Sequence, residues 1–100
     1  MHYIPNSKAE LNEVLQTIWT YAPDEYSDLY WPTPERPTME SDYKVLREGI
    51  DIVFKQKRFN DRRQKLKELV EESYNVFLSG DRKSGIEIIS QIQIMVGKMK

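Results

Sequence analysis

Apolar residues recur every three or four positions in four stretches of the chain, and this spacing predicts four helices. The stretches are residues 7–22, 40–58, 61–79 and 81–98. A helix with one apolar stripe must bury that stripe against another element, so the pattern predicts an all-α fold. We expect one domain over residues 1–100, a small bundle of three to four helices.

Each stretch has its own set of expected core residues. In the first stretch they are Leu11, Val14, Leu15, Ile18 and Ala22, and in the second Tyr43, Leu46, Ile50, Val53 and Phe54. In the third they are Leu66, Leu69, Val70, Tyr74 and Phe77, and in the fourth Ile88, Ile89, Ile92, Met95, Val96 and Met99. The run Gln91-Ile92-Gln93-Ile94 alternates as a strand does, but no second strand-like run exists to pair with it, so helix is favoured.

Capping residues mark the ends of these helices. Ser7 and Glu10 have the spacing of a capping box, in which Ser7 accepts from the N–H of Glu10 and Glu10 reaches back to the N–H of Ser7. Thr38 or Ser41 can cap the second helix. The first two helices therefore have defined starting points.

The later boundaries are marked less evenly. Asn60 or Asp61 can cap the third helix, although this pair is a moderate breaker and helices two and three could run on as one bent helix. Gly80 is placed to take the left-handed conformation after the third helix, and Asp81 can cap the fourth.

Residues 23–39 differ from the helical stretches. They hold four of the five prolines and three large aromatic residues, namely Pro23, Pro32, Pro34, Pro37, Tyr26, Tyr30 and Trp31. Closely spaced prolines block regular helix, and flexible linkers rarely carry several large aromatics. We expect an ordered proline- and aromatic-rich loop between the first two helices.

Charge divides the chain into two parts. Residues 1–44 carry three bases and eight acids, a net charge of −5, and residues 45–100 carry twelve bases and eight acids, a net charge of +4. The two parts add up to the net charge of −1. Such halves can pair with each other, or each can face a partner of opposite charge.

The sequence offers little equipment for catalysis. It has no cysteine, and its only histidine, His2, lies beside the first residue, where a fixed geometry is rare. No phosphate-binding or nucleophile motif occurs. We therefore expect no enzymatic activity, no cofactor and no metal site. No apolar run is long enough for a membrane span, and the first six residues lack the charged lead and apolar run of a signal peptide, so we expect a cytoplasmic protein.

The first candidate binding region is the acidic aromatic segment, residues 24–42. Its candidate contact residues are Asp24, Glu25, Tyr26, Asp28, Tyr30, Trp31, Glu35, Glu40 and Asp42. Tyrosine and tryptophan anchor interfaces because they give large contact area with few rotors, and acids around them steer the surface toward a basic target. In the alternative, Tyr26, Leu29 and Trp31 fold back to cover the bundle.

The second candidate is the basic segment, residues 55–67. It contains Lys55, Lys57, Arg58, Arg62, Arg63, Lys65 and Lys67 against a single acid, Asp61. Clustered bases are typical of phosphate binding, so a small nucleic-acid-binding regulator is the first alternative function. In the alternative without a partner, these bases form a solvated helix face. A third possibility is a self-associating adaptor that uses an apolar face around Ile86, Ile92 and Ile94.

Size, helical pattern and surface chemistry together resemble the small helical bacterial immunity proteins, which neutralise a nuclease or other toxin. The resemblance is carried by the run from Asp24 to Trp31 and by the acids Glu35, Glu40 and Asp42. It implies an antitoxin-like inhibitor that covers the basic cleft of a toxin or other effector in the cytoplasm. The near-zero net charge and the basic segment depart from the most acidic members, which leaves the basic segment as an alternative binding face.

Overall fold

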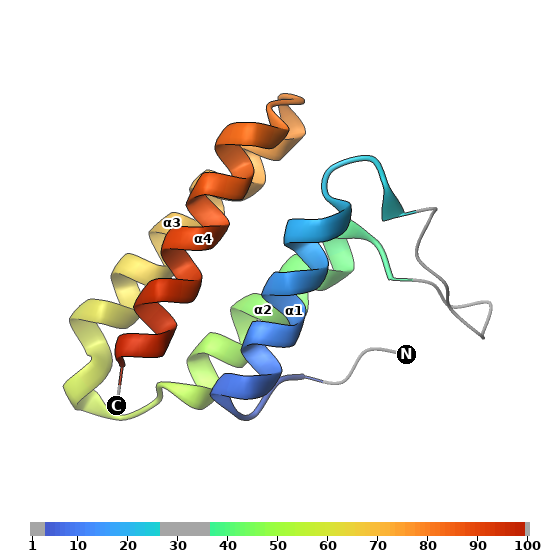
Figure 1. The fold of residues 1–100 in the computed structure, drawn as a ribbon. Helices are drawn as coiled ribbons and strands as arrows, with labels where there is room; N and C mark the ends of the chain where they lie inside the picture. The colour runs from blue at the N-terminus through green and yellow to red at the C-terminus, as the bar shows by residue number, and fades with distance from the viewer. Residues whose placement is uncertain (1–3, 27–36, 100) are drawn as a thin grey trace.

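The computed structural model describes residues 4–26 and 37–99, and these residues form four α-helices and one 3₁₀ helix (Figure 1). The helices are α1 (Lys8–Tyr21), α2 (Met39–Val53), α3 (Asn60–Leu78) and α4 (Arg82–Lys98), with η2 (Lys57–Phe59) directly before α3. No strand occurs in the described part of the chain. The expected all-α class is confirmed, and the alternating run around Ile92 lies within α4.

The helices alternate in direction along the chain (Figure 1). The α1–α2 pair and the α3–α4 pair pack together so that α1 contacts α4 and α2 contacts α3, with the most extensive contact between α3 and α4. The radius of gyration, 13.1 Å, is close to that of a compact chain of this length. One end of the bundle therefore holds the α2–α3 connection, and the opposite end holds the α3–α4 turn.

The core is built from the predicted apolar stripes. Leu11, Leu15 and Ile18 of α1 have no exposed surface, and most of the residues expected to be buried on the other helices keep 8% or less of their surface exposed. Four expected core residues, Val14, Val53, Tyr74 and Met95, are only partly buried and pack against the edge of the cluster. Periodicity thus identified the inward faces correctly and overestimated the depth of these edge positions.

Side-chain caps fix the starts of α1 and α2. Ser7 Oγ accepts from the N–H of Glu10 at 3.2 Å as predicted, but the Glu10 carboxylate accepts from the N–H of Asn6 at 2.9 Å, where Ser7 was expected to be the donor. Thr38 caps α2 in a reciprocal box with Ser41, with distances of 3.0 and 2.8 Å. Both predicted candidates at the start of α2 therefore take part in one cap.

The turn between α3 and α4 follows the prediction. Gly80 has φ of +90°, the left-handed conformation that glycine adopts at low cost after a helix. Asp81 then caps α4 by accepting from the N–H of Ser84 at 3.1 Å. Hydrogen bonding from the backbone and the side chain of Ser84 lowers the pKa of the Asp81 carboxyl.

The connection between α2 and α3 differs from the prediction. α2 ends at Val53, several residues before the expected boundary at 58, and the two helices are separate. Phe54 and Phe59 are both buried and their ring centroids lie 5.3 Å apart, so burial of this pair requires the chain to turn between them. Neither Asn60 nor Asp61 caps α3, because η2 leads directly into it and places Phe59 at the N-cap position.

No helix in the parts of the chain that the structure describes is long and apolar enough to cross a membrane.

Candidate partner-binding site

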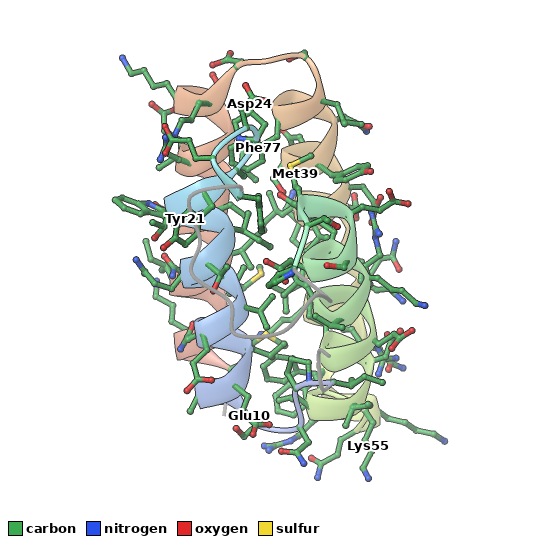
Figure 2. All side chains as sticks on the ribbon, turned by 90° about the vertical axis from the view of Figure 1, so that its right-hand side faces the viewer. Glu10, Tyr21, Asp24, Met39, Lys55 and Phe77 are labelled. Carbon is green, nitrogen blue, oxygen red and sulfur yellow. The ribbon has the colours of Figure 1, made fainter. Side chains whose placement is uncertain are left out.

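The end of the bundle where α1 stops and α2 begins carries the described part of the acidic aromatic segment, and we call it the acidic end. Asp24, Glu25 and Glu40 are exposed there. Figure 2 shows Asp24 at the opposite end of the bundle from Lys55. Three of the nine predicted contact residues therefore place their carboxylates on one end surface.

Two of the predicted contact residues are not on this surface. Tyr26 and Asp42 keep only 8% and 3% of their surface exposed, and Tyr26 Oη donates to Asp42 Oδ2 at 2.8 Å. Burial, together with the charge of Asp42, raises the pKa of the Tyr26 hydroxyl, which therefore stays protonated as a donor. The expectation that Tyr26 and Asp42 face a partner is wrong for this structure, since the pair joins the segment after α1 to α2 inside the fold.

The chain is anchored on both sides of residues 27–36. Tyr26 is buried on one side, and on the other side Pro37 is buried next to the Thr38 cap. The remaining candidates Asp28, Tyr30, Trp31 and Glu35 lie outside the described residues, as does most of the predicted proline- and aromatic-rich loop. Their attachment points are nevertheless both at the acidic end.

Arg82 of α4 contacts the end of α1 and Glu25 at the acidic end. Its guanidinium donates to the carbonyl oxygen of Thr20 at 3.0 Å and lies 3.5 Å from a carboxylate oxygen of Glu25. This contact satisfies a carbonyl in the last turn of α1 and holds Glu25 close to the bundle. An ion pair this exposed adds little stability, so its main effect is to position the carboxylate.

The basic segment lies at the other end of the bundle, which we call the basic end. Three of its seven bases make contacts within the fold. Arg63 donates to the carbonyl oxygen of Phe54 at 2.8 Å, Lys67 Nζ lies 3.0 Å from Asp51 Oδ1, and the Arg58 guanidinium lies 4.4 Å from the centre of the Phe59 ring. The other four, Lys55, Lys57, Arg62 and Lys65, are exposed and make no ion pair with the described residues.

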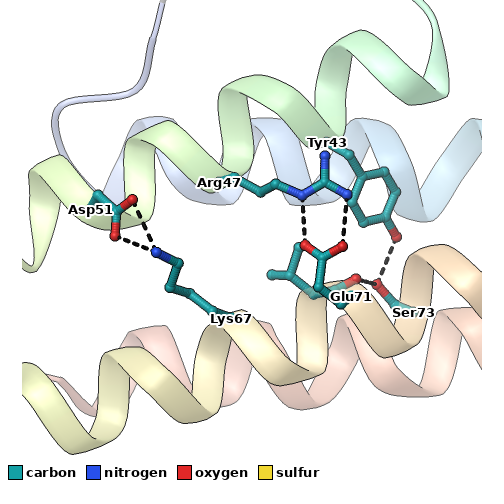
Figure 3. A network of polar contacts seen from close by, with 7 residues as sticks. Tyr43, Arg47, Asp51, Lys67, Glu71 and Ser73 are labelled. Atoms are coloured by element: carbon teal, nitrogen blue, oxygen red, sulfur yellow. Dashed lines mark hydrogen bonds and ion pairs between the residues drawn. The ribbon is translucent and has the colours of Figure 1, made fainter.

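A polar seam between α2 and α3 connects the two ends (Figure 3). Arg47 makes two hydrogen bonds to the Glu71 carboxylate, at 2.6 and 3.0 Å, while Lys67 bridges to Asp51 one turn further along α2. Sequence reasoning missed this seam. The signal was present, because Arg47 and Asp51 are four residues apart, as are Lys67 and Glu71, and antiparallel helices align such pairs.

A buried contact completes the seam. Tyr43 Oη and Ser73 Oγ are 2.7 Å apart, and Ser73 donates its own proton to the carbonyl oxygen of Val70, so Tyr43 is the donor between the two. Burial raises the pKa of the Tyr43 hydroxyl. The Arg47 guanidinium lies over the rings of Tyr43 and Tyr74, at 5.7 and 5.2 Å from their centres. The seam therefore holds α2 and α3 in one register.

The apolar face expected to mediate self-association is mostly core. Ile92 has no exposed surface and Ile86 is partly buried against the cluster, whereas Ile94 is 59% exposed. The expected three-residue face is therefore wrong for Ile92, and only Ile94 is largely open. Among residues 4–26 and 37–99, no group of three or more histidine, cysteine or acidic side chains is placed to hold a metal ion.

These features define an antiparallel four-helix bundle, over the described residues, with an acidic end and a basic end. Comparison of the chain with protein-family models, with curated proteins and with solved structures finds no match.

Proposed function

We propose that the protein is a protein-binding inhibitor of the immunity-protein kind, which covers the active-site cleft of a toxin in the cytoplasm and has no catalytic activity of its own. The observation that carries the proposal is that the exposed Asp24, Glu25 and Glu40 lie at the same end of the bundle as the buried Tyr26 and Pro37, the residues on either side of residues 27–36. Within that span the sequence supplies Asp28, Tyr30, Trp31 and Glu35.

The mechanism is occlusion. A nuclease cleft is lined by bases that bind phosphate, and a surface with several carboxylates is attracted to it before contact, which raises the association rate. Tyrosine and tryptophan then supply apolar contact area that slows dissociation. The Tyr26–Asp42 hydrogen bond and the Thr38 cap fix the residues on either side of residues 27–36, which lowers the conformational entropy cost of binding.

The nucleic-acid alternative is weakened because Arg58, Arg63 and Lys67 make contacts within the fold. Phosphate binding depends on how many cations can displace counterions, and only part of the basic segment remains available for this.

The proposal is tested by protection of growing cells. A candidate toxin domain, encoded beside the gene for this chain, is induced in cells that also express the chain. We expect the wild-type chain to restore growth, and we expect the combined variant Asp24→Lys, Glu25→Lys and Glu40→Lys to lose most of this protection, because the three reversed charges repel a basic cleft.

A matched variant at the basic end, Lys55→Glu, Lys57→Glu and Lys65→Glu, provides the control, and circular dichroism establishes that both variants fold. It should protect as well as the wild-type chain. The proposal fails if the wild-type chain gives no protection against the domain, or if reversal at the basic end abolishes protection while reversal at the acidic end does not.

A further inference from the structure

A hollow lies between α3 and α4 at the basic end. It has a volume of about 390 Å³ and is lined by Arg62, Gln91, Ile94, Met95, Lys98 and Met99. A second hollow of about 330 Å³ lies between the start of α1 and the α2–α3 connection, with Val53, Phe54 and Phe59 in its lining. Met99 is part of the lining of both hollows.

The floor of the first hollow is apolar and adaptable. Ile94 is 59% exposed, Met95 is partly buried, and Met99 has almost no exposed surface. An isolated exposed isoleucine is ordinary on a protein surface, but here it adjoins two methionines in a concave site. Methionine side chains are unbranched and polarisable, and they reshape readily around an apolar group.

Each of the two hollows also has two cationic side chains in its lining. Arg62 and Lys98 line the first hollow, and Lys8 and Arg58 line the second. Lys8 is engaged with the carbonyl oxygen of Met99 at 2.7 Å, whereas Arg62 and Lys98 have no ion-pair partner in the parts of the chain that the structure describes. The exposed cations therefore flank the apolar surface of the first hollow.

We propose that the first hollow, between α3 and α4, binds an acidic segment of a second protein partner. The segment places an apolar side chain on Ile94 and Met95 and its carboxylates beside Arg62 and Lys98. Charge complementarity selects an acidic occupant, and the exposed isoleucine selects one with an apolar anchor. The first hollow is at the opposite end of the bundle from the surface proposed to bind the toxin, so the toxin and the second partner can be bound at the same time.

The same geometry disfavours nucleic acid as the occupant. Single strands bind by stacking bases on exposed aromatic rings, and the aromatic residues that line these hollows, Phe54 and Phe59, are buried. A duplex would engage the cations through its phosphates and would leave the apolar surface of Ile94 unused.

The test is a selection from a random dodecapeptide library on the immobilised wild-type chain, followed by fluorescence-anisotropy titration of the recovered peptides. We expect recovered peptides to combine aspartate or glutamate with leucine, isoleucine or phenylalanine. Ile94→Ser should weaken their binding about tenfold, because one buried aliphatic side chain contributes an effect of that order.

The control is Leu78→Ser. Leu78 is 60% exposed, nearly the same as Ile94, and lies at the end of α3, which is at the acidic end of the bundle. Binding should be unchanged in this variant. Arg62→Gln combined with Lys98→Gln should also weaken binding, and the effect should shrink at high ionic strength.

Three outcomes overturn the proposal. One is a selection that recovers basic sequences, or none above the background of the Ile94→Ser variant. Another is a labelled random RNA or duplex DNA that binds more tightly than the selected peptides and is insensitive to Ile94→Ser, which would make this a nucleic-acid surface. The third is concentration-dependent dimerisation of the wild-type chain in sedimentation that Ile94→Ser abolishes, which would make a second copy the occupant.

Discussion

The two ends of the bundle use their charged residues in opposite ways. At the acidic end a carboxylate, Asp42, enters the interior with Tyr26 and supports the fold, while Asp24 and Glu40 stay outside. At the basic end the cations that support the fold lie at the surface, as does Arg63, which donates to the carbonyl oxygen of Phe54 at the C-cap of α2. The charge counted along the sequence therefore differs from the charge available to a partner, because at each end some charged side chains are engaged in contacts within the fold.

The helix dipoles do not create this polarity. In an antiparallel arrangement each end gathers two helix N-termini and two C-termini, so their partial charges largely cancel. The charge difference comes from side chains, above all from Asp24, Glu25 and Glu40 at one end and from Lys55, Lys57 and Lys65 at the other. Substitution of these side chains can therefore change each end separately.

The largest expected difference between the ends concerns two glycines of α4. A Cβ at Gly85 would lie 2.6 Å from Phe77 Cδ1, whereas a Cβ at Gly97 would meet nothing within 4 Å. Gly85→Ala should lower the free energy of unfolding by about 1–3 kcal/mol through overpacking. Gly97→Ala, near the basic end, should raise it by about 0.5 kcal/mol, because alanine favours helix. Urea denaturation measures both, and equal shifts of the same sign would contradict this packing.

A second difference is sensitivity to high pH. The hydroxyl of Tyr26 has a pKa raised above its ordinary value of 10.0, and so has that of Tyr43 in the seam. Their contribution to stability is fully present below pH 10. It is lost as pH rises further, because the unfolded chain then releases protons that the folded chain keeps. The decline should approach about 1.4 kcal/mol per pH unit for each tyrosine.

Denaturation across the alkaline range, compared between the wild-type chain and Tyr26→Phe, checks this dependence. The variant should lose stability less steeply above pH 10, although at neutral pH it should be about 1–2 kcal/mol less stable, because the Asp42 carboxylate loses a donor. Identical slopes would show that Tyr26 ionises freely in the folded chain. At the basic end the contacts of Arg58 and Arg63 should persist, since arginine keeps its charge throughout this range.

The smallest expected difference separates the bases that support the fold from those that face solvent. Arg63→Ala should cost about 1 kcal/mol, because the carbonyl of Phe54 loses its donor. Lys65→Ala, two residues along the same helix, should change stability by less than about 0.5 kcal/mol. Thermal denaturation of the two variants makes the comparison, and equal costs would mean that Arg63 has no capping role.

Local features of the sequence predicted much of the fold. The apolar stripes placed the core, and Ser7, Thr38, Gly80 and Asp81 marked helix boundaries, because caps and periodicity depend on residues within one or two turns. The early end of α2 was missed. It depends on the packing of Phe54 against Phe59, and their local pattern is compatible with a continued helix.

The candidate site was less predictable for a related reason. Tyr26 and Asp42 fit an acidic aromatic surface by composition, yet they are paired across sixteen residues of sequence, and only the fold brings them together. The hollow beside Ile94 likewise depends on how α3 and α4 cross. Composition identified Asp24, Glu25 and Glu40 as carboxylates that are exposed in the fold, but it could not separate them from the buried Asp42.

We propose that the acidic end is the surface that contacts a toxin. The most direct test of this proposal is the association rate with the purified toxin domain, measured by stopped flow at increasing ionic strength. We predict a fast rate that falls with salt for the wild-type chain and for the reversal of Lys55, Lys57 and Lys65, and a slow rate with little or inverted salt dependence for the reversal of Asp24, Glu25 and Glu40. Unchanged association after reversal at the acidic end, with slow association after reversal at the basic end, would show that the basic end is the surface that contacts the toxin.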